Sequence, residues 1–199
     1  MRQKNKKNSY KYIAFEGIDK SGKTTIAEKF ADYLSIEYPV FLTKEPGAKS
    51  GVFRDLLLSQ RWNKKTELFL FLADRADGIE LIKKRLAEGI VISDRSLYST
   101  LAYQGYGEGI DIDFLTQLNR FATDNLFPDV VFLIDIDIDT MKKRSSQADA
   151  IESKSIEFFK RVREGYLKLA DRFDNFFVID GTKTIEKVFN QVVDIWNSL

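Results

Sequence analysis

The fold class is decided by the stretch Gly17-Ile18-Asp19-Lys20-Ser21-Gly22-Lys23-Thr24. It matches the pattern G-x-x-x-x-G-K-[ST], whose glycines let the backbone turn so that its N–H groups surround phosphate oxygens. An apolar segment at 13–15 precedes it and a helical pattern at 25–30 follows it, which is the strand–loop–helix setting that the motif requires. The sequence therefore predicts a phosphate-binding loop at the positive end of a helix.

The motif assigns roles to the polar side chains of this loop. Lys23 is expected to reach the β- and γ-phosphates of ATP, and the Thr24 hydroxyl to ligate Mg²⁺. An ordinary GTPase is disfavoured, because the guanine-reading motif N-K-x-D is absent from the sequence. The predicted ATP-binding residues are Gly17, Ile18, Asp19, Lys20, Ser21, Gly22, Lys23, Thr24 and Thr25.

Five apolar, β-branched or aromatic runs alternate with helical patterns along the chain. Strands are predicted at 12–16, 39–43, 90–93, 130–135 and 176–180, and helices at 23–36, 65–88, 111–125, 153–173 and 184–199. Nearly continuous apolar strands are typical of a parallel sheet covered on both faces. We therefore predict one α/β domain over 1–199, a three-layer P-loop NTPase-type fold with a five-stranded parallel sheet. Ligands are expected beyond the carboxyl ends of the strands.

The composition excludes several kinds of chemistry. The 199 residues include no Cys and no His, which rules out disulfides, thiolate nucleophiles, Ser-His triads and His-ligated metals. The 31 basic and 30 acidic side chains nearly balance, so neither nucleic acid nor a membrane is an expected partner. Residues 1–11 form a basic tail without the apolar stretch of a signal peptide, so a cytoplasmic enzyme is expected.

A second candidate element directly follows the predicted strand at 90–93. Asp94 would face the phosphate loop, where it would hold Mg²⁺ or orient the acceptor. The planar fork of Arg95 matches a phosphate bidentately. A surface Asp–Arg pair that caps a turn is the alternative. The buried strand before the pair, and Ser99-Thr100-Leu101-Ala102-Tyr103-Gln104-Gly105 behind it, favour the functional interpretation.

Several segments, in order along the chain, resemble the thymidylate kinase family of P-loop nucleoside-monophosphate kinases. Besides the phosphate loop they are Lys44-Glu45-Pro46-Gly47, Phe69-Leu70-Phe71-Leu72-Ala73-Asp74-Arg75, Asp94-Arg95, Ala102-Tyr103-Gln104-Gly105 and Asp149-Ala150-Ile151-Glu152. The resemblance runs from residue 12 to 199. It implies transfer of the γ-phosphoryl group of ATP to dTMP with Mg²⁺, a homodimer, and a lid at 142–152.

The resemblance also implies how dTMP is bound. Phe71 would stack on the thymine, Arg75 would lie near the base or the phosphate, and Arg95 would hold the phosphate with help from Arg54. Asp19 and Glu152 would lie near the sugar 3′-hydroxyl. The predicted acceptor-binding residues are Asp19, Glu45, Arg54, Phe71, Arg75, Arg95, Ser99, Tyr103, Gln104 and Glu152. The predicted catalytic residues are Lys20, Lys23, Asp94 and Arg95, and the predicted metal ligands are Thr24 and Asp94.

Simpler interpretations stay open for some of these residues. Packing alone would explain Phe71 and Tyr103, and a solvated position would explain Arg54. An ion pair with Asp74 or Asp77 would explain Arg75.

The sequence departs from the family pattern at three places. The loop at 48–50 has an unusual sequence and is short before Arg54, and Ser96 follows Asp94-Arg95 where many members have tyrosine. The lid has no arginine between residues 145 and 153, where bacterial members often place one against the transferring phosphoryl group. Lys20 is expected to supply that charge. Lys142, Lys143 or Arg144 would supply it if Lys20 points to solvent.

Two other functions remain open at this point. The segment Asp94-Arg95-Ser96 also resembles the E-R-S segment of deoxynucleoside kinases, although these have glutamate in place of Asp94 and lack Glu45-Pro46-Gly47. A nucleotide-binding regulatory module without turnover is the other alternative. This alternative has two reasons. The lid has no arginine, and Lys20 of the phosphate loop is a point charge that lacks the planar fork of arginine.

Overall fold

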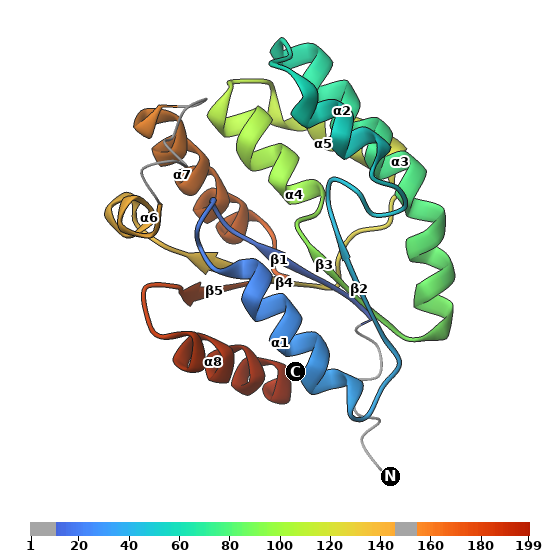
Figure 1. Cartoon of the computed structure of the whole chain (residues 1–199), viewed down its shortest axis with the longest axis vertical. Helices are drawn as coiled ribbons and strands as arrows, with labels where there is room; N and C mark the ends of the chain where they lie inside the picture. The colour runs from blue at the N-terminus through green and yellow to red at the C-terminus, as the bar shows by residue number, and fades with distance from the viewer. Residues whose placement is uncertain (1–10, 146–154) are drawn as a thin grey trace.

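The computed structural model describes residues 11–145 and 155–199, with a five-stranded sheet at the centre (Figure 1). The strands are β1 (Tyr12–Glu16), β2 (Val40–Lys44), β3 (Ile90–Asp94), β4 (Val130–Asp135) and β5 (Phe176–Asp180). Their order is β2-β3-β1-β4-β5, and all four pairings are parallel. The predicted α/β fold with a five-stranded parallel sheet is therefore confirmed.

Helices cover both faces of the sheet, so the molecule has three layers (Figure 1). On one face, α1 (Lys23–Ser35) and α8 (Ile185–Ser198) pack against Ile13, Phe15 and Phe132. On the other face, Val131 and Leu133 pack with apolar side chains of several helices. Among these helices are α4 (Leu97–Thr100), the π-helix η2 (Leu101–Gly107), α5 (Ile112–Ala122) and α7 (Ile156–Arg172). Successive residues of β1 and β4 thus point to opposite faces, as the pleat dictates.

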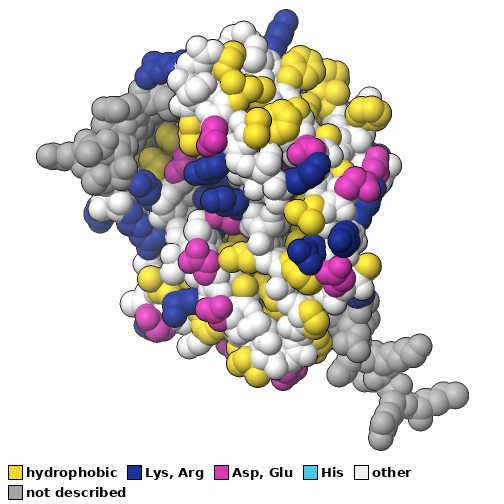
Figure 2. All heavy atoms as spheres, turned by 45° about the vertical axis from the view of Figure 1, so that its right-hand side comes forward, with side chains coloured by type: hydrophobic (Ala, Val, Ile, Leu, Met, Phe, Trp, Pro, Cys, Tyr) yellow, Lys and Arg dark blue, Asp and Glu magenta, His cyan; other side chains and the backbone are white. Residues whose placement is uncertain are grey.

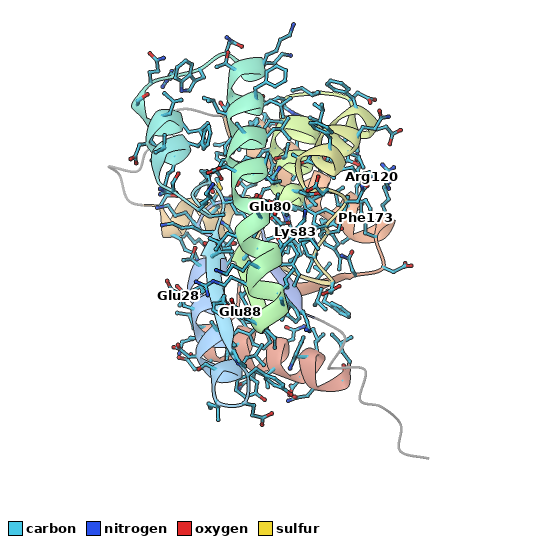
Figure 3. The ribbon with its side chains drawn as sticks, turned by 90° about the vertical axis from the view of Figure 1, so that its right-hand side faces the viewer. Glu28, Glu80, Lys83, Glu88, Arg120 and Phe173 are labelled. Carbon is cyan, nitrogen blue, oxygen red and sulfur yellow. The ribbon has the colours of Figure 1, made fainter. Side chains whose placement is uncertain are left out.

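The long helix α3 (Lys64–Glu88) lies beside β3, where Ile82 packs with Tyr12 and Val91. It starts after Asn63, whose side chain accepts hydrogen bonds from two backbone N–H groups of the first turn. Figure 3 shows α3 across the front of the molecule between α2 (Val52–Ser59) and α5. Lys83 forms an ion pair with Glu80 on the same helix (Figure 3). It forms a second ion pair with Asp124, just after α5.

The predicted elements differ from the structure mainly at their ends. The predictions for β1, β4 and β5 are matched residue for residue, whereas α5 ends earlier than predicted, at Ala122. The short helices α2, α4, η2 and α6 (Ile138–Arg144) were not predicted. Each has at most eight residues, too few for a clear helical periodicity. In the described part of the chain, no helix is long and apolar enough to cross a membrane.

The loops that follow the first three strands meet at one edge of the sheet. Phe15 of β1 lies opposite Asp94 of β3, and the Phe15 carbonyl accepts a hydrogen bond from the Arg95 N–H at 3.0 Å. The Glu45 N–H, just after β2, donates to the Asp94 carbonyl at 3.0 Å. The phosphate loop, the Asp94-Arg95 pair and Glu45 therefore come together, as parallel strand topology predicts.

Candidate active site

The phosphate loop connects β1 to α1, as the sequence predicts. Gly17 has a φ of 143°, and a Cβ atom there would come 2.5 Å from the Ile134 carbonyl oxygen, so only glycine fits. Gly22, with a φ of 90°, turns the chain into α1, which has no side-chain cap and no acidic residue in its first turn. Backbone N–H groups at this helix start are therefore suited to bind phosphate oxygens.

Lys23 is the buried cation of this loop, with 6% of its surface exposed. Burial, and then the nearby positive charge of Arg95, lower the pKa of Lys23 from 10.5 to about 8. Asp19, Asp94 and Glu16 act in the opposite direction but do not offset the loss of solvent. The nearby carboxylates do not fully stabilise the buried ammonium group of Lys23. An anion bound beside it would stabilise its charge, so the site is suited to bind an anion.

Thr24 and Asp94, the two predicted metal ligands, lie in direct contact. The Thr24 hydroxyl donates to Asp94 Oδ2 at 2.5 Å. Asp94 Oδ1 is buried, and no donor among the described residues reaches it. A buried carboxylate oxygen without a partner, beside a threonine hydroxyl, fits the oxygen ligands that Mg²⁺ prefers. These two residues could hold that ion together with phosphate oxygens.

Arg95 sits opposite the phosphate loop in an unusual backbone conformation. Its φ of 74° lies in the left-handed region, which residues with a Cβ atom seldom adopt. Its guanidinium donates to Asp19 Oδ1 and lies 5.0 Å from the centre of the Tyr103 ring. Burial opposes ionisation of Asp19, but Arg95 and Lys23 outweigh it and lower the pKa of that carboxyl group. Arg95 is thus a fixed cation at the cleft.

A cavity of about 590 Å³ opens beside Arg95. It has the size of a small-molecule site. Of the ten predicted acceptor-binding residues, the nine that the structure describes all line it; Glu152 lies outside the described residues. They are Asp19, Glu45, Arg54, Phe71, Arg75, Arg95, Ser99, Tyr103 and Gln104. The structure therefore brings together side chains from the loops after β1, β2 and β3 and from α2, α3, α4 and η2.

Arg75 lines this cavity, and protein groups engage all five of its N–H donors. Nε and Nη2 donate to Glu45 Oε2, Nη1 donates to Thr100 and Asn119, and Nη2 also donates to the Ser96 carbonyl. With 3% of its surface exposed, Arg75 is a buried, saturated cation. Among the described residues its ion-pair partner is Glu45, and not the adjacent acids considered from the sequence.

Asp74 fixes the loop that carries Glu45. Its two carboxylate oxygens accept from the Gly47 N–H at 3.0 and 2.9 Å. Burial raises the pKa of Asp74. Consecutive residues of α3, Asp74 and Arg75, therefore fasten the two ends of the Glu45-Pro46-Gly47 segment. Gly47 also lies beside Arg54, since a Cβ atom built on Gly47 would be 3.7 Å from the Arg54 Cδ.

Further polar contacts organise the walls of the cavity. The Tyr103 hydroxyl donates to Asp19 at 3.2 Å, and Gln104 Nε2 donates to Glu67 at 3.2 Å. Phe71 is partly buried on α3. Trp62 also lines the cavity, and its indole N–H donates to the Leu56 carbonyl.

Sequence reasoning missed some residues of this region. Glu16 ends β1 with a fully buried carboxylate, and an acid inside an otherwise apolar strand was the signal for it. Burial raises the pKa of Glu16. Asn119 and Thr100 bind Arg75, and no spacing in the sequence indicated this.

Two of the cations considered for the transfer step, Lys20 and Arg144, lie at the edge of the loop. Lys20 is exposed and has a φ of 64°. Arg144, at the end of α6, donates to the backbone carbonyls of Lys20, Ser21 and Gly181 at 3.3, 3.1 and 2.8 Å. It therefore fastens the outside of the phosphate loop. Residues 146–152 of the predicted lid lie outside the described residues.

Comparisons with known proteins agree with this geometry. A family model described as thymidylate kinase matches residues 15–192. A thymidylate kinase of Sulfurihydrogenibium sp. is 46% identical, over 92% of this chain and 95% of the relative, and one of Fervidobacterium nodosum is 39% identical, over 94% and 98%. The crystal structure of thymidylate kinase from Ehrlichia chaffeensis has a TM-score of 0.80 and 36% identity, over 94% of this chain and 98% of that one. These matches do not favour a deoxynucleoside kinase or a regulatory module. The chain belongs to the thymidylate kinase family.

Proposed function

We propose that this chain transfers the γ-phosphoryl group of ATP to dTMP, with Mg²⁺, to give dTDP. The observation that carries the proposal is the position of Arg95, which lies between the phosphate loop and a cavity lined by all nine described acceptor candidates. A monophosphate bound in this cavity would have its phosphate near Arg95 and Lys23. Family membership supports the identity of the substrates.

The donor side is the phosphate loop with the start of α1. Its backbone N–H groups and Lys23 would bind the ATP phosphates, and phosphate binding would keep Lys23 charged. Thr24 and Asp94 would hold Mg²⁺, which neutralises phosphate charge when it is bound. Asp94 Oδ1, which no donor in the described part of the chain reaches, supports this assignment.

The acceptor side is the cavity. Arg95 would hold the dTMP phosphate, with Arg54 as a second contact from α2, and the Phe71 ring would stack on the thymine. Arg75 would act mainly as a fixed wall, because its five donors already have partners. Asp19, Ser99, Tyr103 and Gln104 would surround the sugar and base.

Transfer itself needs positioning and charge neutralisation more than covalent chemistry. Lys23 and Arg95 would face the moving group from the two sides of the cleft. Lys20, on the variable part of the loop, would add a third cation. Lys20 is exposed at the surface of the loop.

A coupled assay tests the activity directly. The protein with ATP and Mg²⁺ is offered dTMP, dUMP and thymidine as separate acceptors, and ADP release is measured. Turnover is expected with dTMP and none with thymidine. Turnover of thymidine alone would indicate a deoxynucleoside kinase, and no turnover with any acceptor would contradict the proposal.

A homodimer is part of the proposal, and exposed apolar side chains on three adjacent helices support it. Figure 2 shows apolar side chains gathered over the region of α2, α3 and α5. Val52 and Leu58 on α2 are 66% and 72% exposed, Phe69 on α3 is 60% exposed, and Phe121 on α5 is 85% exposed. Patches of this kind mark protein interfaces.

Light scattering after gel filtration tests the homodimer. The wild type is expected to have twice the mass of the 23.0 kDa chain. Phe69→Glu is expected to give monomers. Ile36→Glu is the matched control, because Ile36 is 81% exposed but lies just after α1, away from these helices. A monomeric wild type would contradict this part. The cytoplasmic location stays a prediction.

A further inference from the structure

Glu16 is a buried carboxylate that has no part in the proposed binding of ATP or dTMP. Its side chain is fully buried at the end of β1, directly before Gly17 of the phosphate loop. A buried carboxylate is costly unless both oxygens accept hydrogen bonds. The donors here come from the segment that carries Arg95 and from α7, and not from the phosphate loop.

Both oxygens of Glu16 are satisfied. Oε1 accepts from the backbone N–H and from the hydroxyl group of Ser96, each at 2.7 Å. Oε2 accepts from the Ser99 hydroxyl at 2.6 Å and from the Tyr166 hydroxyl at 2.8 Å. Burial raises the pKa of Glu16, but these hydrogen bonds and the charge of Arg95 act in the opposite direction and favour the ionised form. Bonds to an ionised acceptor are stronger than bonds between neutral groups. Glu16 therefore binds the first turn after Arg95 at several points.

These bonds hold the backbone of Arg95 in its left-handed conformation. On one side, the Arg95 N–H donates to the Phe15 carbonyl at 3.0 Å, and the Ser93 hydroxyl donates to the Arg95 carbonyl at 2.6 Å. On the other side, the next N–H, that of Ser96, is fixed by Glu16. A disfavoured conformation persists only where the surroundings over-determine it. Glu16 supplies the constraint on the carboxyl-terminal side.

The same carboxylate supports the Arg95 side chain. Arg95 Nη1 donates to the Ser99 hydroxyl at 3.2 Å, and that hydroxyl donates its own proton to Glu16 Oε2. With its proton directed to Glu16, the Ser99 oxygen is left to accept from the guanidinium. The orientation of Arg95 thus depends on Glu16 through its backbone and through its side chain.

We propose that Glu16 is a positioning residue, which holds Arg95 so that its guanidinium binds the phosphate of the acceptor. The inference rests on the proposed function, because the acceptor phosphate is the ligand assigned to Arg95. Loss of the Glu16 carboxylate would loosen Arg95 and weaken dTMP binding. ATP binding at pH 6.5 would change little, since the Glu16 oxygens bond to none of the loop residues assigned to ATP and Lys23, with a pKa of about 8, stays charged at that pH.

Glu16→Gln is the main test, because it keeps the shape and replaces one acceptor oxygen by an NH₂ donor. KM is measured separately for dTMP and for ATP at pH 6.5, where Lys23 stays charged in both proteins. The KM for dTMP is expected to rise about tenfold, the scale of one weakened charge-assisted bond, while the KM for ATP stays within about twofold. An unchanged KM for dTMP, or an equal rise in both values, would overturn the inference.

Asp129→Asn is the matched control. Asp129 Oδ2 accepts from the backbone N–H groups of Lys11 and Tyr12, both at 2.8 Å, at the opposite end of β1. This variant is expected to lower the melting temperature and to leave both KM values unchanged. If Glu16→Gln fails to fold, Ser96→Ala removes one donor to the same carboxylate, and a smaller rise in the KM for dTMP alone is expected. No such rise would overturn the inference.

A double-mutant cycle with Arg95→Ala separates positioning from a general structural role. If Glu16 acts through Arg95, Glu16→Gln raises the KM for dTMP by less than about twofold in the Arg95→Ala background. An equal rise in both backgrounds would overturn the inference. Calorimetric titration of dTMP into the wild type and into Glu16→Gln compares their affinities for dTMP without turnover. If the wild type binds dTMP but does not phosphorylate it, the proposed function fails while the role of Glu16 is still tested.

Discussion

Deprotonation of Lys23 by rising pH tests the electrostatics of the donor site. Burial, and then Arg95, lower its pKa from 10.5 to about 8. This shift means that the folded protein destabilises the protonated form of Lys23, relative to the neutral form, by roughly 3 kcal/mol. ATP phosphates favour the charged form, so binding should return the proton that the free protein has lost. In the free protein at pH 8, about half of the Lys23 side chains are charged.

The prediction has a thermodynamic and a kinetic side. Calorimetry of ATP binding at pH 8, in two buffers of different ionisation enthalpy, should show uptake of about half a proton, and almost none at pH 6.5. The value of kcat/KM for ATP, which reports the free enzyme, should fall about tenfold per pH unit above pH 8. Both follow from the same group, because the phosphate-binding form of Lys23 is the protonated one.

The pH profile of kcat/KM for ATP should have an inflection near pH 8, and two variants test whether Lys23 causes it. Arg95→Ala removes the second-largest cause of the shift, so the inflection should move toward higher pH. Lys23→Arg keeps a charge at every pH in the range, so its ATP affinity should show no inflection near pH 8. A wild-type kcat/KM that stays flat to pH 9.5, with no proton uptake, would refute the reasoning.

Further changes test the assigned roles. Lys23→Ala should abolish transfer while cooperative unfolding persists; loss of the unfolding transition would assign Lys23 to packing. Arg95→Ala should weaken dTMP binding by about 1.5–3 kcal/mol through loss of a charge-assisted contact, with a much smaller effect on ATP. Lys20→Ala should lower kcat with both KM values unchanged, and Lys20→Arg should keep or raise activity; parental behaviour of both variants would exclude the role. Phe30→Ala, in the fully buried core between β1, β4 and α8, should destabilise by about 3–5 kcal/mol in chemical denaturation, and a loss below 1 kcal/mol would contradict that packing.

The parallel sheet was predictable because its signals are local. The strands are apolar on both faces, and each is followed by a helix with its own periodicity. The loop between β1 and α1 was also predictable, because a backbone that surrounds phosphates requires glycine at fixed spacing, as at Gly17 and Gly22. The short helices α2 and α6 and the π-helix η2 carried no such signal.

The candidate acceptor residues came from ordered family motifs, and the cavity brings the described ones together. What the motifs did not give was the pairing among them. Arg75 next to Asp74 and near Asp77 suggested a pair on the same helix, yet its partner is Glu45, from the loop after β2. Pairing across elements depends on strand order, which no single motif contains.

By itself, the sequence determined the fold class, the phosphate loop and the family, because these depend on local periodicity and on residues at fixed spacing. Only the tertiary structure decided that Glu16 binds Ser96, Ser99 and Tyr166, and that Arg95 adopts a left-handed backbone over the cleft. These contacts join residues far apart in the chain. They arise because β1 and β3 are neighbours in the sheet and because α7, packed against η2, β4 and β5, brings Tyr166 to Glu16. Burial of the whole core fixes this arrangement.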